Sequence, residues 1–155
     1  AKMLFANPQR IDYYDRYQEI IDAYNAEQNR ATIEKTFMDL MELASSLDTE
    51  QQRYVREGFS SDEELSVYDL LFSENLTKQE IETIKKVSVD LLTKIKQQIA
   101  KLDHWTDKQE TKAIVDNLIR NTLWQELPNS YDVSDIQTYQ KKIYEYVYMR
   151  YPEVA

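Results

Sequence analysis

The first sixty residues carry two helical patterns of apolar positions. Asn7 followed by Pro8 is typical of a helix start, because asparagine caps free amide groups and proline fits the first turn. Behind this start, apolar residues recur at helical spacing: Tyr14, Tyr17, Ile21 and Tyr24, with Tyr13 and Ile20 beside them. The run 25–29 has no apolar stripe, so we predict that it ends a first helix that begins at about Pro8.

A second helical stripe is formed by Ile33, Phe37, Leu40, Ala44 and Leu47. Residues 48–50 would allow a new turn to start. The pattern slightly favours one long, bent helix that continues to Tyr54 and ends at Gly58, since glycine readily adopts the left-handed conformation after a helix. Residues 8–58 are therefore the N-terminal helices of the prediction.

Two capping boxes mark the next helices. Ser61 with Glu64, and Thr77 with Glu80, have the spacing in which side chains cap the free amides of a first turn. The first box opens a short helix with apolar residues Leu65, Tyr68, Leu71 and Phe72. The second opens the clearest element, a long amphipathic helix over about residues 78–102. Its apolar face is Ile81, Ile84, Ser88, Leu91, Leu92, Ile95, Ile99 and Leu102.

Two further helices complete the pattern. Thr106 is the expected cap of a helix from Asp107 to about Leu127, and Ser134 or Asp135 that of a last helix to about Tyr151. The predicted stripe of the first is Ala113, Ile114, Leu118 and Leu127, broadened by Val115, Ile119, Leu123 and Trp124. The predicted inner face of the second is Ile136, Tyr139, Ile143, Val147 and Arg150. We predict an all-α fold, a single bundle of five to seven helices over 1–155.

Composition agrees with this fold. One glycine and three prolines in 155 residues leave little room for hairpins of strands. The chain has no cysteine, which excludes disulfides and thiolate metal sites, and no apolar run long enough to cross a membrane. We expect a cytoplasmic domain, and the abrupt start suggests a C-terminal fragment of a larger chain.

The sequence offers no catalytic, cofactor-binding or metal-binding constellation. Phosphate loops need several glycines, because backbone amides must approach the phosphate closely. The lone His104 has Lys101, not glutamate, three residues before it, so the Glu-x-x-His pair of di-iron bundles is missing. We expect no enzymatic activity in this chain.

The net charge argues against a function in nucleic-acid binding. With 19 basic and 28 acidic residues the net charge is −9, whereas proteins that hold DNA through its phosphates are usually basic. The long helix nevertheless has a lysine-rich face, and its candidate DNA-facing residues are Lys85, Lys86, Lys94 and Lys101. A solvated face is the alternative interpretation.

Tyrosine suggests a partner surface. Six of the twelve tyrosines lie from Tyr131 onward. In the last helix, Tyr144, Tyr148 and Tyr151 widen the apolar arc beyond what one bundle contact needs. Tyrosine is favoured at interfaces because it is large and stiff with one polar end. The alternative is a helix central in its bundle.

Several short motifs occur in a fixed order. Residues 64–71 read Glu-Leu-Ser-Val-Tyr-Asp-Leu-Leu, and the long helix follows them. Residues 102–108 contain Asp, Trp and Lys, with His104 inserted after Asp103. Further on, Lys112 precedes Ala113, and residues 127–131 read Leu-Pro-Asn-Ser-Tyr. This order, from Glu64 to Tyr151, resembles the helical C-terminal region of the restriction (R) subunit of type I restriction-modification enzymes. The segment 11–24 resembles the start of that region more loosely.

The resemblance implies a division of labour within a longer polypeptide. In that family the same chain carries a nuclease domain and two motor domains, which use ATP and magnesium to translocate and then cleave DNA. None of those motifs is present here. The resemblance implies that the helical region packs on the motor domains of its own chain and docks the R subunit onto the methyltransferase and specificity subunits. DNA contact through the lysine-rich face is the alternative.

Overall fold

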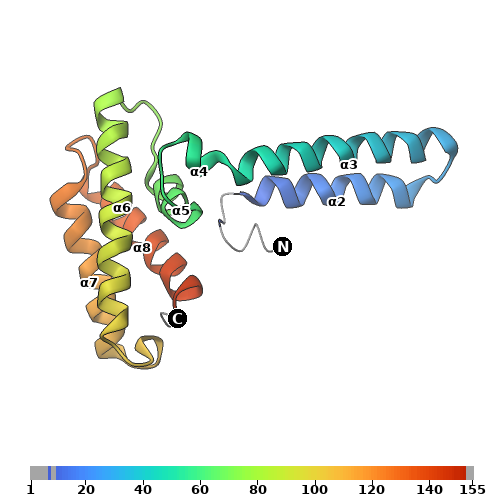
Figure 1. Cartoon of the computed structure of the whole chain (residues 1–155). Helices are drawn as coiled ribbons and strands as arrows, with labels where there is room; N and C mark the ends of the chain where they lie inside the picture. Colours follow the sequence, from blue (N-terminus) through green and yellow to red (C-terminus); the bar gives the residue numbers. More distant parts are fainter. Residues whose placement is uncertain (1–6, 8–9, 153–155) are drawn as a thin grey trace. The chain divides into compact units, whose positions relative to one another are not determined.

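A computed structural model describes residue 7 and residues 10–152 (Figure 1). These residues form seven α-helices, α2 to α8, and one 3-10 turn, η2, without any strand among them. The predicted all-α fold is confirmed. The chain divides into two compact units, Ala1–Ser66 and Val67–Ala155, and the boundary falls inside α5 (Asp62–Leu71). One helix thus contributes to both units, and the single domain stays a prediction.

The first unit is built on an antiparallel helical hairpin, α2 (Ile11–Ala26) and α3 (Arg30–Gln51) (Figure 1). The turn between them is sharp because Asn29 caps α3: its side-chain oxygen accepts a hydrogen bond of 2.9 Å from the Thr32 amide. The first helix ends in the polar run, as predicted. Its predicted cap Asn7 lies before Arg10 rather than next to the helix, and Pro8 lies outside the described residues.

The hairpin has almost no core. No residue of α2 is buried, and only Leu43 and Glu50 of α3 are. In the predicted stripe, Ile33 and Phe37 are exposed, as is Ala44, while Leu40 and Leu47 are half-buried. The predicted helix is thus confirmed, but only part of its stripe is covered, because two paired helices enclose only a narrow strip between them.

The predicted long helix is interrupted. It breaks at Gln52, after which a short α4 (Arg53–Arg56) follows. Gly58 then ends it with a φ of 87°, as predicted. The Gly58 amide donates to the Val55 carbonyl and the Phe59 amide to the Tyr54 carbonyl, which satisfies two carbonyls that the helix end leaves free.

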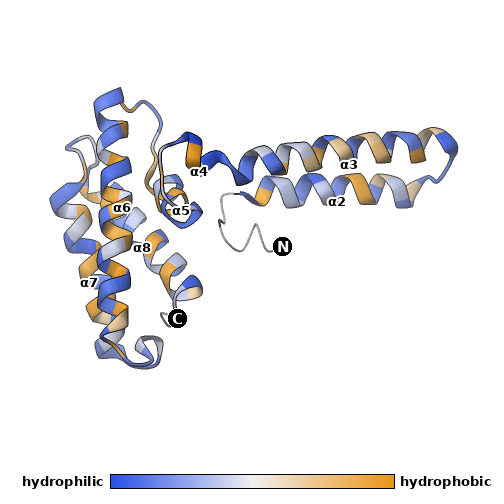
Figure 2. Ribbon diagram, in the orientation of Figure 1, coloured by the Kyte–Doolittle hydropathy of each residue, from blue (hydrophilic) through white to orange (hydrophobic). Residues whose placement is uncertain are grey.

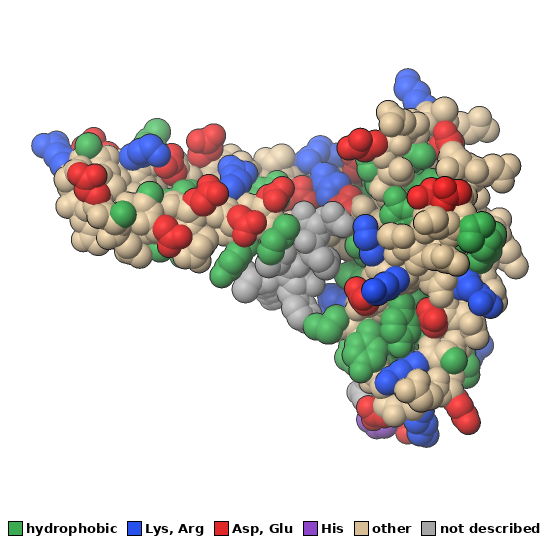
Figure 3. Space-filling model, turned by 180° about the vertical axis from the view of Figure 1, so that it is seen from behind, with side chains coloured by type: hydrophobic (Ala, Val, Ile, Leu, Met, Phe, Trp, Pro, Cys, Tyr) green, Lys and Arg blue, Asp and Glu red, His purple; other side chains and the backbone are tan. Residues whose placement is uncertain are grey.

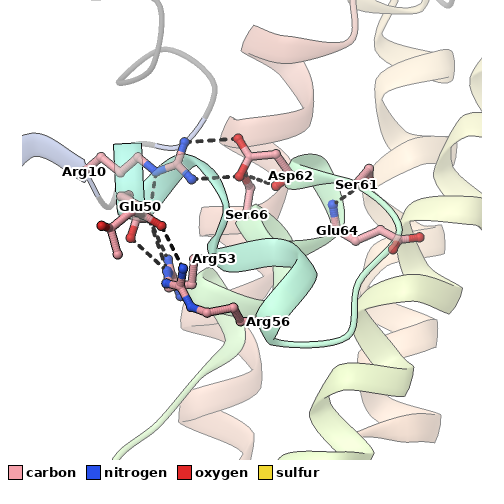
Figure 4. Close-up of polar contacts among 9 residues, drawn as sticks. Arg10, Glu50, Arg53, Arg56, Ser61, Asp62, Glu64 and Ser66 are labelled. Carbon is pink, nitrogen blue, oxygen red and sulfur yellow. Dashed lines mark hydrogen bonds and ion pairs between the residues drawn. The ribbon is translucent and has the colours of Figure 1, made fainter. Parts of the chain in front are cut away.

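The open ends of the hairpin are joined by Arg10 (Figure 4). Its Nε donates to Glu50 at 2.9 Å, and its two terminal nitrogens donate to the two Asp62 oxygens at 3.0 and 2.7 Å. Arg53 also donates to Glu50, at 3.0 Å. Burial alone would raise the pKa of Glu50, yet the hydrogen bonds from Arg53 and Arg10 lower it. The start of α2, the end of α3 and the start of α5 therefore share one ionic cluster.

The second unit packs α7 (Gln109–Glu126) against α6 (Lys78–Ala100) and α8 (Val133–Arg150) (Figure 1). The apolar and polar bands of Figure 2 alternate along these helices, as expected for amphipathic elements. Within this unit, the Tyr131 hydroxyl donates to the Leu71 carbonyl, and burial raises the pKa of Tyr131, which keeps this donor protonated.

The long helix α6 agrees best with its prediction. The Thr77–Glu80 capping box is present in both directions, at 3.1 Å each. The buried residues of α6 are Ile84, Val87, Ser88, Leu91, Leu92, Ile95 and Ile99. The predicted face is thus confirmed in its centre, whereas Ile81 and Leu102 at its ends are only half-buried.

Three predicted caps need correction. At Ser61–Glu64, the hydroxyl accepts from the Glu64 amide at 3.3 Å, but the Glu64 carboxylate accepts from Ser60 instead of Ser61. The cap of α7 is Lys108, because Thr106 belongs to the turn η2 (Trp105–Asp107). The cap of α8 is Asp132, which forms a full capping box with Asp135, rather than Ser134 or Asp135.

The faces of the last two helices also differ from prediction. Of the predicted α7 stripe, Leu127 is buried, and so are Val115, Ile119 and Leu123, which were predicted to broaden it; Thr122 is buried as well. Ala113, Ile114 and Trp124 are exposed. On α8, Ile136, Ile143 and Val147 are buried as predicted, together with Tyr146. Tyr139 and Arg150 are half-buried. The actual stripe of α7 lies to one side of the predicted one, because α7 packs against two neighbours.

We expect Arg10→Ala to lower the free energy of unfolding by about 3 kcal/mol, because it leaves two carboxylates, one of them nearly buried, without their shared cation. Urea unfolding followed by circular dichroism measures this change. Arg30→Ala is the matched control, since Arg30 pairs with Glu34 but its side chain is 94% exposed. Equal effects of the two substitutions would contradict the role of Arg10.

In α6, Leu91→Asp should cost at least about 3 kcal/mol, because it places an unpaired carboxylate at a position with no exposed surface. Val89→Asp, two residues away and 36% exposed, should cost about 1 kcal/mol or less. Thermal unfolding of both variants tests this difference; a Leu91→Asp variant as stable as Val89→Asp would show that the assigned face is wrong.

Candidate partner-binding surfaces

Trp105 organises the C-terminal end of the second unit. The chain leaves α6 and turns at His104, whose φ of 49° is left-handed, into the turn η2. Trp105 opens this turn and has no exposed surface. Its Nε1 donates a hydrogen bond of 2.7 Å to the Tyr151 carbonyl just after α8. The connector between α6 and α7 is thereby fixed to the end of α8.

The predicted tyrosines gather around this tryptophan. The Tyr144 and Tyr148 rings both meet the Trp105 ring edge-on, with centroids 6.0 and 5.8 Å away. Tyr148 remains 38% exposed, and the Lys112 ammonium nitrogen lies over its ring, 5.9 Å from the ring centroid. Tyr144 is half-buried, and burial, followed by the nearby charge of Asp116, raises its pKa.

Tyr151 differs from the other two. It is buried, with 7% of its surface exposed, and Lys96 lies over its ring at 5.6 Å. Of the three candidates, only Tyr148 and part of Tyr144 reach the surface. Tyr144 and Tyr148 share the contact with Trp105, whereas the Tyr151 ring packs against Tyr146. The sequence analysis gave no structural role to Trp105.

Two of the four lysines on the lysine-rich face of α6 lie in ion pairs. Lys94 lies 3.0 Å from Asp90 and 3.1 Å from Glu126, and the hydrogen bonds that its ammonium group donates to both carboxylates raise its pKa. Lys85 lies 4.0 Å from Glu82, while Lys86 and Lys101 are exposed. His104 is exposed beside Asp103, at 3.4 Å. Among the described residues, no group of His, Cys, Asp or Glu is arranged to hold a metal ion.

The hairpin presents a surface that the sequence did not predict. Its exposed apolar side chains are Ile11, Tyr14, Tyr17, Ile33, Phe37, Met38 and Met41, of which Phe37 and Met38 are 63% and 65% exposed. Residues 11–51 also contain ten acidic and three basic residues, a net charge of −7 out of −9 for the chain. Carboxylates follow the hairpin along its length in Figure 3. Helical spacing alone could not reveal this surface, because it does not show whether a stripe is covered.

None of the helices in the described part of the chain has a stretch apolar and long enough to cross a membrane.

Trp105→Phe keeps most of the ring contacts but removes the Nε1 donor, so the Tyr151 carbonyl loses its partner. We expect a loss of about 2 kcal/mol in the free energy of unfolding. Trp124→Phe, at a position 48% exposed, is the control and should be nearly neutral. Urea unfolding of both variants, measured by circular dichroism, compares them; similar stabilities would contradict the structural role of Trp105.

Comparison with known proteins gives one match. Neither the curated proteins nor the solved structures include a match to this chain. The family model "Type I restriction enzyme HindI endonuclease subunit-like, C-terminal" matches residues 6–151, nearly the whole chain. The resemblance seen in the sequence motifs is confirmed. This chain therefore belongs to the family of C-terminal regions of type I restriction enzyme HindI endonuclease subunit-like proteins.

Proposed function

We propose that this chain is a docking module, which attaches the restriction subunit of a type I enzyme to the methyltransferase and specificity subunits. The family match supports a role within a restriction endonuclease subunit. In this proposal the nuclease and the ATP- and magnesium-dependent motor lie in other parts of a longer polypeptide. The chain itself contributes binding rather than catalysis, and works in the cytoplasm, where the restriction complex meets DNA.

The observation that carries this proposal is the hairpin. None of the 16 residues of α2 is buried, so burial of apolar surface within the chain stabilises this helix only a little. Its apolar side chains Ile11, Tyr14 and Tyr17 remain exposed. Amphipathic helices are usually stabilised by covering their apolar face. Clustered exposed apolar side chains mark protein interaction sites in soluble proteins. A partner that covers the hairpin would supply the burial that the hairpin lacks.

The aromatic cluster of the second unit supplies a second, smaller exposed surface. Tyr148 is held at the surface by Trp105 and is therefore stiff, which lowers the entropy lost when a partner immobilises it. We include Tyr144 and Tyr148 in the proposed docking surfaces. Tyr151 is left out of these surfaces, because it is buried and its ring packs against Tyr146.

Direct DNA contact is the less favoured function. A lysine track on α6 would need its ammonium groups available for phosphates, whereas Lys94 already bridges Asp90 and Glu126. The net charge of −9 would also repel the phosphate backbone. We therefore propose that any DNA contact occurs through the assembled complex.

Light scattering after size exclusion tests docking directly. We expect this chain to form a stable complex when it is mixed with the methyltransferase–specificity core of its own restriction system. Tyr144→Ala with Tyr148→Ala should weaken the complex if the aromatic cluster takes part. Absence of any complex at tens of micromolar would overturn the docking function.

A further inference from the structure

We infer that one side of the α2–α3 hairpin is the docking face, and that it binds a basic protein surface: an apolar strip bordered by lysine and arginine. This apolar hairpin face consists of Tyr14 on α2 and Ile33, Phe37 and Met41 on α3, each about half exposed or more. The inference rests on the proposed docking function and names the chemistry of the partner.

The contact between the two helices fixes which side each residue occupies. On α2 the half-buried residues Tyr13, Ile20 and Tyr24, with Ile21 to one side of them, mark the side that meets α3, and on α3 the buried Leu43 marks the side that meets α2. Successive residues of a helix are turned by about 100°. Positions on either helix can therefore be placed relative to this contact.

The apolar residues fall on the same side of the hairpin. Seen from the start of each helix, Tyr14 on α2 and Ile33 and Phe37 on α3 lie about a quarter turn from the contact, in the same rotational sense. Because the helices are antiparallel, equal rotations in the same sense lead to the same side of the pair. Met41 lies further round at the outer edge of this face.

The opposite side of the hairpin is polar except at its outer edge on α3, where Met38 is exposed. A quarter turn in the other sense leads to Asp12, Arg16 and Glu19 on α2, and to Lys35, Asp39 and Glu42 on α3. Lys35 and Asp39 satisfy each other there in a salt bridge of 2.9 Å. A hairpin that only needed solubility would have no reason to differ between its sides. The asymmetry therefore indicates which side meets a partner.

Carboxylates border the apolar hairpin face on both outer edges. The same spacing places Asp15 and Asp22 on α2 and Glu34 on α3 about half a turn from the contact, on the outer edges of the hairpin, and Asp48 just beyond Phe37 on α3. We name these four residues the acidic rim. The one cation on this side, Arg30, is paired with Glu34 at 3.3 Å. The rim is thus complementary to a basic border around the partner's apolar strip.

Charge also indicates which kind of partner binds the apolar hairpin face. A second copy of this chain would bring two hairpins, each with a net charge of −7, against each other, which disfavours self-association through this face. Nucleic acid is disfavoured for the same reason. A basic protein surface is the occupant that both the apolar centre and the acidic rim fit.

The first test compares two neighbouring exposed residues of α3. Phe37 and Met38 are similarly exposed but point about 100° apart. We expect Phe37→Ala to weaken binding of this chain to the methyltransferase–specificity core about tenfold or more. Met38→Ala should change the Kd by less than about twofold. Circular dichroism of both variants establishes that the hairpin still folds.

The second test makes the same change in net charge at two different positions around α2. Asp15→Lys with Asp22→Lys reverses part of the acidic rim, and Asp12→Lys with Glu19→Lys makes the same net change on the polar side. We expect the rim variant to lose about tenfold in affinity, with a weaker salt dependence, and the control variant to lose clearly less.

The outcomes separate this inference from the docking function. If the unchanged chain does not bind the core, docking itself fails and the inference fails with it. If the unchanged chain binds but Phe37→Ala and Met38→Ala bind equally well, docking stands and the hairpin face is wrong. A dimer of this chain that Phe37→Ala dissociates would show that the occupant is a second copy, which would also overturn the inference.

Discussion

The guanidinium group of Arg10 is the contact on which the hairpin depends. It joins Glu50 at the end of α3 to Asp62 at the start of α5, across 40 and 52 residues of sequence. Its planar fork lets Nε face one carboxylate while the two terminal nitrogens bind the other, which a lysine could not do. Since the hairpin buries so little apolar surface, this ionic cluster determines where its two open ends meet.

The two units therefore rely on different physical interactions. In the second unit, buried aliphatic residues such as Leu91 and Ile119 supply an ordinary apolar core, and Trp105 ties the end of α8 to it. In the hairpin, the charged cluster at one end replaces a core. A segment held mainly at one end keeps its remaining surface available, as the proposed docking function requires.

Sequence reasoning succeeded where the determining interactions are local. The Thr77–Glu80 box and the centre of the α6 face depend on residues a few positions apart, and both were predicted. It failed where burial depends on a second helix. Helical spacing identifies Phe37 as part of a stripe but does not show whether another helix covers that stripe. The Arg10 cluster had no local signature at all, because its partners are distant in sequence. The cap of α8 was placed a few residues late, since Asp132, Ser134 and Asp135 are all good caps.

Acidic side chains beside an exposed apolar strip have two physical effects. An uncovered strip that includes Phe37 and Met41 would promote aggregation, and like charges on neighbouring molecules oppose it. The same charges attract only a surface of opposite sign, so they discriminate among partners before any apolar contact forms. Under the proposed docking function, solubility while free and selectivity on assembly follow from one arrangement of carboxylates on the hairpin.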